Sequence, residues 1–208
     1  MNKDILYCAS QSASRQMILR NSEIPFKLLE HTSDELVPHP EDDFKAYVLA
    51  IAHAKLKTVI LPTPGEHGSE PLFVLTADTL VRTQKTRQIL GKPRDREHAR
   101  QILTIVGQEP IEVVTGCCLE KMVADDGQWK TVDAAHWTTE TLVEYVVEPV
   151  LIDDYLASTP LALRACGASI VEGYGQNFLK SIQGSYTNVL GLPLFELRQE
   201  LKRLNFRY

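Results

Sequence analysis

Apolar and polar residues follow one another along this chain in two patterns, one typical of strands and one typical of helices. Short continuous apolar runs, such as Leu72 to Leu75, have the length of buried strands. Elsewhere, as at Phe44, Val48 and Ile51, apolar residues recur near helical spacing. The runs predict strands at 5–9, 26–31, 72–75, 111–122, 130–145, 167–171 and 178–182. The helical spacing and its breakers predict helices near 16–19, 41–61, 94–107, 149–156 and 193–204.

Turn residues separate these elements and indicate how the sheet is built. Asp126 and Gly127 are typical of a two-residue hairpin, so the strands on either side of them should pair antiparallel. Residues 62–71, rich in proline and glycine, are interpreted as an inserted loop, and residues 184–188 as a polar loop. Strands and helices alternate without a parallel-only pattern, and no repeat divides the chain. We therefore predict an α/β fold with a mixed sheet, in one domain spanning residues 1–208.

Composition excludes several classes of protein. The chain has 208 residues, 44% of them hydrophobic, and a formal net charge of -5 without any basic block, which argues against non-specific nucleic-acid binding. The first residues contain only a brief apolar run, so we predict neither a signal peptide nor a membrane span, and a cytoplasmic location. The four cysteines show no CxxC spacing and the six histidines no HxxxH pair, which favours reduced, mostly buried thiols over a zinc site.

An acid and a cation suggest the chemistry. Asp78 is predicted at the carboxyl end of the 72–75 strand, where a side chain faces a crevice, and Lys92 lies in a turn between Gly91 and Pro93. This pairing suits a phosphorylated, metal-bound substrate, in which the acid holds the cation or polarises water and the lysine meets phosphate oxygen. The alternative is a strand-end acid that caps the next turn and a solvated lysine.

A second candidate site precedes it in the chain. Ser10, Ser12 and Arg15 lie where a strand passes through a hydroxyl-rich turn into a helix, whose first N–H groups attract an anion. The two hydroxyls can donate to phosphate oxygens and the arginine can fork onto them. The alternative is a simple serine cap beside a solvated arginine. Asp34 and Glu35 form a further acidic site that could join Asp78 around one metal, or could simply be solvated.

In this order, the pieces resemble the Maf family of nucleoside triphosphate pyrophosphatases over nearly the whole chain. The segments that carry the resemblance are Ala9-Ser-Gln-Ser12 with Arg15, Asp34-Glu35, Ile51-Ala-His-Ala-Lys55, Ala77-Asp-Thr79, Leu90-Gly-Lys-Pro93 with Asp95-Arg96, Thr115-Gly116, and Asn188-Val-Leu-Gly-Leu-Pro193. No single segment is specific, but seven in one order are.

The resemblance implies a fold, an activity and a set of site residues. The expected fold is an elongated mixed β-sheet flanked by helices, with two lobes around a deep cleft, similar also to inosine triphosphatase. The expected activity is hydrolysis of a nucleoside triphosphate to monophosphate and diphosphate with a divalent cation, Mg²⁺ or Mn²⁺, by a cytoplasmic homodimer. The implied catalytic residues are Asp78, Glu35 and Lys92, with Asp78 and Glu35 as metal ligands. The implied substrate-binding residues are Ser10, Ser12, Arg15, Lys55, Thr79 and Glu172.

Two departures from the family pattern leave the identity of the substrate base open. A branch of the family that acts on pyrimidine triphosphates typically has two arginines in the first motif and a glutamine in an Ile-Gln-Gly near the end. Here Ser14 precedes Arg15, and Glu172 stands in place of the glutamine, as in the branch that acts on 7-methyl-GTP. Thr79, in contrast, resembles the pyrimidine branch. We expect Glu172 to help select the base, because one carboxylate can accept from both donors of a guanine edge. Its alternative role is that of a solvated turn acid.

A second function from another class fits the same sequence. The family takes its name from an effect on septum formation, so the alternative is a nucleotide-binding regulator of cell division with little or no turnover. A nucleotide-binding structural dimer is a third. Release of diphosphate from a triphosphate would distinguish the enzyme from both.

Overall fold

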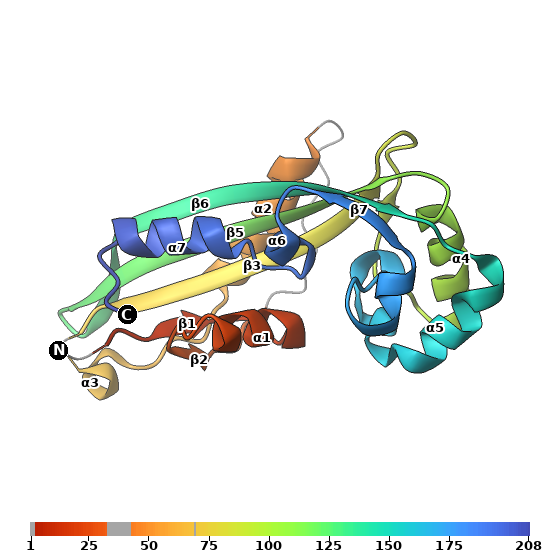
Figure 1. Cartoon of the computed structure of the whole chain (residues 1–208). Coiled ribbons are helices and arrows are strands. Elements are labelled where there is room, and N and C mark those ends of the chain that lie inside the picture. The colour runs from red at the N-terminus through yellow and green to blue at the C-terminus, as the bar shows by residue number, and fades with distance from the viewer. Residues whose placement is uncertain (1–2, 33–42, 69) are drawn as a thin grey trace. The chain divides into compact units, whose positions relative to one another are not determined.

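The computed structural model describes residues 3–32, 43–68 and 70–208 (Figure 1). Seven strands form one sheet with the order β2-β1-β3-β5-β6-β7, and β4 pairs with β3. β1 is parallel to β2 and β3, whereas β4 is antiparallel to β3 and β7 to β6. The strands are β1 Leu6–Cys8, β2 Phe26–Leu28, β3 Leu72–Thr83, β4 Ile89–Leu90, β5 Ile111–Asp125, β6 Gln128–Tyr145 and β7 Leu179–Gln183. The predicted mixed α/β fold is thus confirmed.

Helices of unequal length flank the sheet. The α-helices are α1 Ala13–Asn21, α2 Phe44–Lys57, α3 Pro64–His67, α4 Arg96–Val106, α5 Ile152–Ser158, α6 Tyr186–Val189 and α7 Leu194–Arg203. The 3₁₀ turns are η1 Pro149–Leu151, η2 Pro160–Arg164, η3 Cys166–Ala168 and η4 Gly173–Asn177. Within the described ranges, no helix combines the length and the apolar character needed to cross a membrane.

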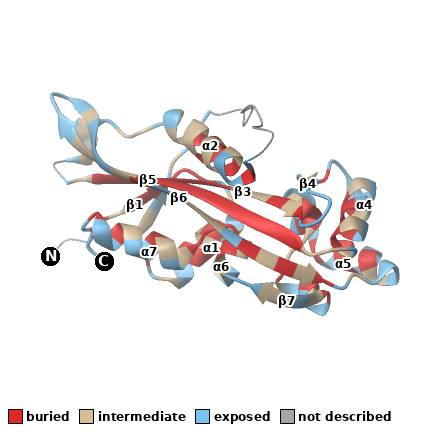
Figure 2. Cartoon of the chain, turned by 90° about the horizontal axis from the view of Figure 1, so that it is seen from above, coloured by how far each residue is buried: buried red, intermediate tan, exposed pale blue. Residues whose placement is uncertain are grey.

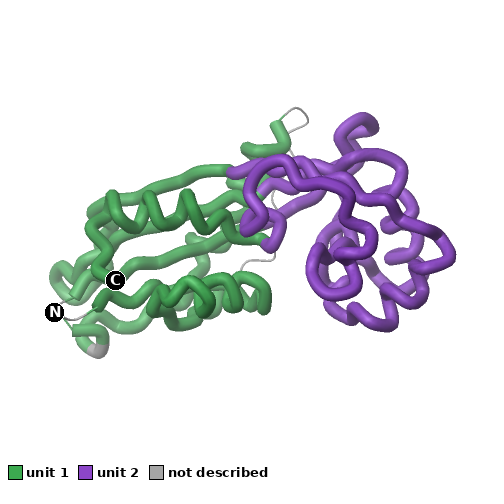
Figure 3. Tube along the Cα trace, viewed as in Figure 1, with its two compact units in different colours: residues 1–78, 115–138, 191–208 green, residues 79–114, 139–190 purple. Residues whose placement is uncertain are grey.

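The chain divides into two compact units, each described here by itself (Figure 3). Unit 1 contains residues 1–78, 115–138 and 191–208, and unit 2 contains residues 79–114 and 139–190. β3, β5 and β6 supply residues to both. The cleft between two lobes and the single domain over residues 1–208 stay predictions.

Unit 1 has a three-layer arrangement. α2 covers one face of the sheet, whereas α1 and α7 lie on the other, as two perpendicular views show (Figures 1 and 2). α2 approaches β5 very closely, because a Cβ added at Gly116 would lie 2.8 Å from the Leu49 Cα. The absence of a side chain at Gly116 therefore allows helix and strand backbones to touch. Unit 1 also joins the chain ends, since the Asp4 N–H donates to the Arg207 carbonyl at 2.8 Å.

Unit 2 is built around its own apolar core. Tyr155 is buried at the centre, and its hydroxyl donates to the Ala168 carbonyl at 2.9 Å and accepts from the Ile170 N–H at 2.8 Å. These bonds satisfy the buried hydroxyl and fix the turns that follow η2. Asn188, also buried, donates from Nδ2 to the Val113 carbonyl, at 3.0 Å. The Asn188 motif therefore ties a short helix to β5.

Local signals explain several boundaries. Asp43 and Asp95 accept from the N–H three residues ahead and cap α2 and α4. The predicted hairpin is confirmed, and Asp126 and Gly127 have φ of 48° and 77°, as a type I′ turn requires.

Other boundaries were predicted wrongly. Residues 167–171 form the end of η3 and irregular chain instead of a strand, because Gly167 and Ala168 both have positive φ. The stretches predicted as loops at 62–71 and 184–188 contain α3 and part of α6. The strand predicted at 72–75 extends to Thr83, so Asp78 lies inside β3 and not at its end. An apolar run marks only the part of a long strand that is buried on both faces.

Candidate active site

The first part of the candidate site lies where β1 passes into α1. Ser12 caps α1 by accepting from the Arg15 N–H at 3.4 Å. The Ser10 hydroxyl oxygen accepts from Arg15 Nη1 at 3.0 Å and from the Ser12 N–H at 3.3 Å. Both of these contacts use the oxygen of Ser10 as acceptor, so the hydroxyl proton can donate to a phosphate oxygen. Ser12 is thus confirmed as a cap, which leaves its predicted contact with phosphate untested.

Arg15 is held in place from the far end of the chain. Its Nε donates to the Gly191 carbonyl at 2.6 Å, and the side chain is buried. Gly191 has φ of 99°, a conformation that favours glycine. Sequence reasoning placed Gly191 in the Asn188–Pro193 motif but missed this role. A glycine followed by Leu192-Pro193 gives no sign that its carbonyl anchors an arginine.

The second part of the site is a buried ion pair. Lys55 Nζ donates to Asp78 Oδ1 at 2.7 Å, linking α2 to β3. Both residues are more than nine-tenths buried. One turn earlier in the helix, the Ala52 carbonyl accepts a hydrogen bond from Thr76 Oγ1 at 2.9 Å. Two successive hydrogen bonds therefore join α2 to β3. The helix therefore presents the lysine to the strand in a fixed register.

Ser10 follows β1, and Asp78 lies on the adjacent parallel strand β3. β1 pairs with β3 only as far as Cys8, which lies opposite Leu75, and Ala9 donates to the Leu75 carbonyl at 2.9 Å. β3 continues beyond this point without β1 beside it. Asp78 therefore lies on an edge of β3 next to the loop that carries Ser10, an arrangement that suits a ligand at the end of a parallel pair.

Three further candidates lie in unit 2. Lys92 is exposed, and the loop around it is anchored by a hydrogen bond of 3.1 Å from the Gly167 N–H to the Gly91 carbonyl. Thr79 follows Asp78 on β3 and is half-buried. Glu172 is half-buried as well, and burial raises the pKa of its carboxyl above its usual range. The structure thus joins Ser10, Arg15, Lys55 and Asp78 in unit 1, and leaves these three to the other unit. Glu35 lies outside the described residues.

Tyr174 and Tyr186 differ in how they relate to Glu172. Tyr174, next but one in sequence, packs against the unit 2 core, with its ring 6.3 Å from that of Tyr155. Tyr186 is 48% exposed, and its hydroxyl pKa is raised by burial and by the charge of Glu172. The surface ring within electrostatic reach of Glu172 is therefore Tyr186.

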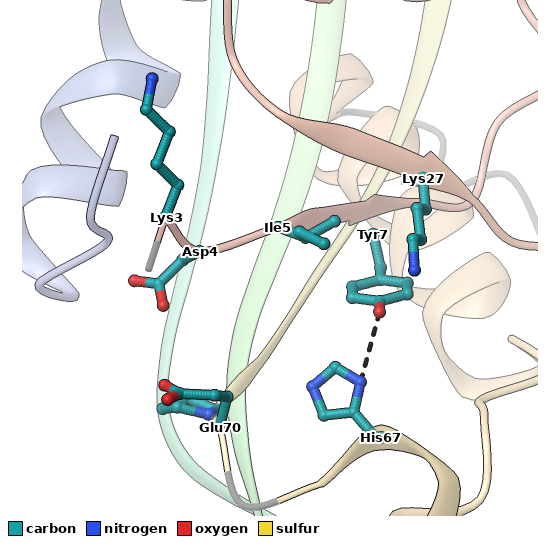
Figure 4. A pocket seen from close by; sticks show the side chains of 8 residues that line it. Lys3, Asp4, Ile5, Tyr7, Lys27, His67 and Glu70 are labelled. Carbon is teal, nitrogen blue, oxygen red and sulfur yellow. Dashed lines mark hydrogen bonds between the residues drawn. The ribbon is translucent and has the colours of Figure 1, made fainter. Parts of the chain in front are cut away.

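A pocket of about 390 Å³ opens elsewhere on unit 1 (Figure 4). Tyr7 and His67 face each other in it, with Tyr7 Oη 3.2 Å from His67 Nδ1. Its lining comes from residues 3–7, from Lys27 on β2 and from the segment before β3, and includes none of the predicted site residues. This pocket is therefore separate from the candidate site.

Comparison with known proteins assigns the arrangement to a family. The model of the family described as "Maf-like protein" matches residues 5–204. The chain belongs to this family. A protein of Yersinia pestis bv. Antiqua (strain Antiqua), named dTTP/UTP pyrophosphatase, is 35% identical over 196 residues, which cover 94% of this chain and 91% of that protein. A protein of Bacillus cereus (strain AH187) with the same name is 34% identical over 208 residues, 99% of this chain and 97% of that one.

The matched range includes every candidate residue of this Maf-like protein, from Ser10 to Glu172. A third relative, also named dTTP/UTP pyrophosphatase, comes from Anaeromyxobacter sp. (strain Fw109-5) and is 34% identical over 95% of this chain and 88% of its own length. The predicted resemblance to the Maf family is thereby confirmed.

Proposed function

We propose that this protein hydrolyses a nucleoside triphosphate to a nucleoside monophosphate and diphosphate. The observation that carries the proposal is the buried Lys55–Asp78 pair, 2.7 Å apart, in the unit that also holds Ser10 and Arg15. Two charges are costly to keep out of water, and a fold that retains them beside hydroxyl and guanidinium donors suits a polyanionic ligand. The names of the relatives support the same reaction class.

Each residue of unit 1 has a role that its contacts support. Arg15 and the Ser10 hydroxyl donate to phosphate oxygens from a position fixed by Gly191. Lys55 is held beside Asp78 and adds a second cation for the phosphate chain. Asp78 accepts the proton of the attacking water. The water oxygen bonds to one phosphorus of the α–β bridge as the bridging bond breaks, and the products are monophosphate and diphosphate.

A divalent cation fits this donor set. Asp78 Oδ1 accepts from Lys55, and Oδ2 makes no hydrogen bond among the described residues. Carboxylate oxygens are the ligands that Mg²⁺ and Mn²⁺ prefer, and Asp78 with Glu35 would hold the ion. When bound, the cation would screen the charge of the phosphate chain.

The proposal also covers which nucleobase the substrate carries. The relatives' names and Thr79 support pyrimidine triphosphates, dTTP and UTP. Glu172 supports a base that offers two neighbouring donors, and the exposed ring of Tyr186 offers a stacking surface within reach of its charge. We therefore propose a pyrimidine-type enzyme whose preference is modified by Glu172 and extends to guanine-type or modified bases.

A panel of triphosphates tests the proposal. The purified protein is incubated with dTTP, UTP, GTP, 7-methyl-GTP and ATP in the presence of Mg²⁺ or Mn²⁺, and the products are separated by ion-exchange chromatography. We expect monophosphate and diphosphate from at least one pyrimidine substrate. Nucleoside diphosphate and orthophosphate would contradict the assigned bond. Binding without any product would favour the nucleotide-binding regulator.

A further inference from the structure

A second cluster of chemically active side chains lies in unit 1, outside the candidate site. His53 on α2, Cys118 on β5 and His136 on β6 each offer one ligand atom, and these atoms all lie within 4.8 Å of one another. The two imidazole rings meet edge to face, with centroids 4.2 Å apart and an interplanar angle of 71°. Three elements distant in sequence therefore converge on one point.

The packing of α2 on β5 produces this convergence. Leu49 lies against Gly116, and the next residue on the same face of each element is His53 on the helix and Cys118 on the strand. The close approach at Gly116 thus brings the histidine down onto the thiol. β6 is the neighbour of β5 in the sheet and supplies His136. The same contact explains why no CxxC or HxxxH spacing announced the cluster.

The donor set has a defined preference. Two imidazole nitrogens and one sulfur suit borderline and soft ions such as Zn²⁺, whereas the hard cations that serve phosphate chemistry prefer oxygen. In a tetrahedral zinc site with bonds of about 2.0–2.3 Å, ligand atoms lie roughly 3.3–3.7 Å apart. An inward movement of about 1 Å by these side chains would close the site around an ion.

The surroundings favour a metal over thiol chemistry. Cys118 is fully buried, which shields its thiol proton and sulfur from reagents in solution. A metal ion would displace that proton, since the ligand is the thiolate. His136 is exposed, which gives an ion a path from solvent.

We propose that His53, Cys118 and His136 form a binding site for a borderline divalent transition-metal ion such as Zn²⁺. Water completes its coordination on the exposed side. The ion fastens α2 to β5 and β6, and α2 also carries Lys55. An ion bound only by the folded state raises the melting temperature of the protein. This site does not depend on the proposed activity.

Cobalt tests the site because it reports on its ligands. Metal-free, reduced full-length protein is titrated with Co²⁺, and the absorption spectrum is recorded. We expect a thiolate-to-cobalt charge-transfer band in the near ultraviolet, together with intense visible bands typical of tetrahedral cobalt, saturating at a single equivalent and abolished by Zn²⁺. A cation held by carboxylates and phosphates produces no thiolate band, so the nucleotide site cannot imitate the signal.

Matched variants assign the signal. His136→Gln alters an exposed side chain and should weaken Co²⁺ binding at least as much as the loss of an outer-shell partner, roughly 10–100-fold. Cys118→Ser should abolish the charge-transfer band, while Cys166→Ser and His98→Gln, outside the cluster, should retain it. Absence of the band in the parent, or its full retention in both His136→Gln and Cys118→Ser, would overturn the proposal.

Thermal unfolding gives an independent readout. Zn²⁺ added to the metal-free parent should raise its Tm, and the same addition should raise the Tm of His136→Gln by less. Equal shifts in parent and variant would place the zinc elsewhere and contradict the site.

Discussion

Lys55 and Asp78 form an ion pair inside unit 1, with Nζ of the lysine 2.7 Å from Oδ1 of the aspartate and both side chains buried. Removing either charge takes an ion-pair partner away from a buried charge, which is costly in a place with little water. The pair therefore couples the stability of unit 1 to the chemistry proposed for it, and experiments on either residue must separate the two effects.

Asp78→Asn should abolish turnover, because the amide keeps the shape of the side chain but cannot accept a proton or hold a cation. The single variant should also be less stable, by up to about 3–5 kcal/mol, since Lys55 stays buried and charged. Adding Lys55→Met removes that charge and should restore most of the stability without restoring activity. Chemical denaturation and turnover are measured on the same three proteins. Parental rates in a folded Asp78→Asn would exclude the catalytic assignment.

Arg15→Ala should lower kcat/KM by roughly 10²-fold or more, the scale expected for one preorganised donor in a closed site. Arg15→Lys tests geometry separately from charge. A lysine keeps the positive charge but has one nitrogen, so it cannot hold both the Gly191 carbonyl and the Ser10 hydroxyl as the guanidinium does. We expect Arg15→Lys to lose most of the activity as well. Steady-state kinetics that match the parent in both variants would remove Arg15 from the phosphate site.

Lys92→Ala should produce a loss of similar size, roughly 10²-fold, if this exposed lysine meets the phosphates. Lys180→Ala serves as control, because that lysine pairs with Glu144 at 2.8 Å on the surface of unit 2. Both variants are assayed at several ionic strengths. Equal rates for Lys92→Ala and Lys180→Ala would show that Lys92 is only a surface cation.

Glu172→Gln should shift the substrate ranking from guanine-type toward pyrimidine triphosphates, by the 1–3 kcal/mol or so that a bidentate contact discriminates. The parent should also show a pH effect. Its carboxyl must be ionised to accept two donors, and its pKa is raised by burial, so the guanine-type preference should weaken as the pH falls toward that raised pKa. The ratio of kcat/KM values for 7-methyl-GTP and UTP is followed against pH. A ratio with the same value and the same pH dependence in both proteins would show that Glu172 does not contact the base.

Gly116→Ala should destabilise unit 1, because the added methyl group would lie 2.8 Å from the Leu49 Cα and neither backbone can move freely. Overpacking of this kind costs about 1–3 kcal/mol. Gly65→Ala is the matched control, since no atom lies within 4 Å of its added Cβ. Unfolding midpoints are compared for the two variants. Similar midpoints would contradict the close packing of α2 on β5.

The sequence predicts the elements best where one local signal decides them. The Asp126-Gly127 turn correctly fixed the hairpin, whereas the two helices predicted near 41–61 and 94–107 begin two or three residues later, after the caps at Asp43 and Asp95. The limits of β3 could not be read in this way, because the strand continues past its apolar run into a stretch that mixes polar and apolar residues. Pairing in the sheet, a tertiary effect, determines where such a strand ends.

The candidate site was predictable in its residue types but not in its partnerships. The order of motifs identified Ser10, Arg15, Lys55 and Asp78, and the structure adds which of them pair. That Asp78 shares a site with Lys92 stays a prediction, and the structure adds the hydrogen bond of Asp78 with Lys55. Contacts such as Arg15 with Gly191 join residues far apart in the chain and depend on the assembled fold.

Release of diphosphate by the parent and by Asp78→Asn tests the central claim most directly. Each protein is incubated with UTP and a divalent cation, and orthophosphate is measured with and without added inorganic pyrophosphatase. We predict that the parent gives a signal only when pyrophosphatase is present, and that Asp78→Asn gives none in either case. Orthophosphate released by the parent without pyrophosphatase, or a full signal from a folded Asp78→Asn, would contradict the proposed reaction and the role of Asp78.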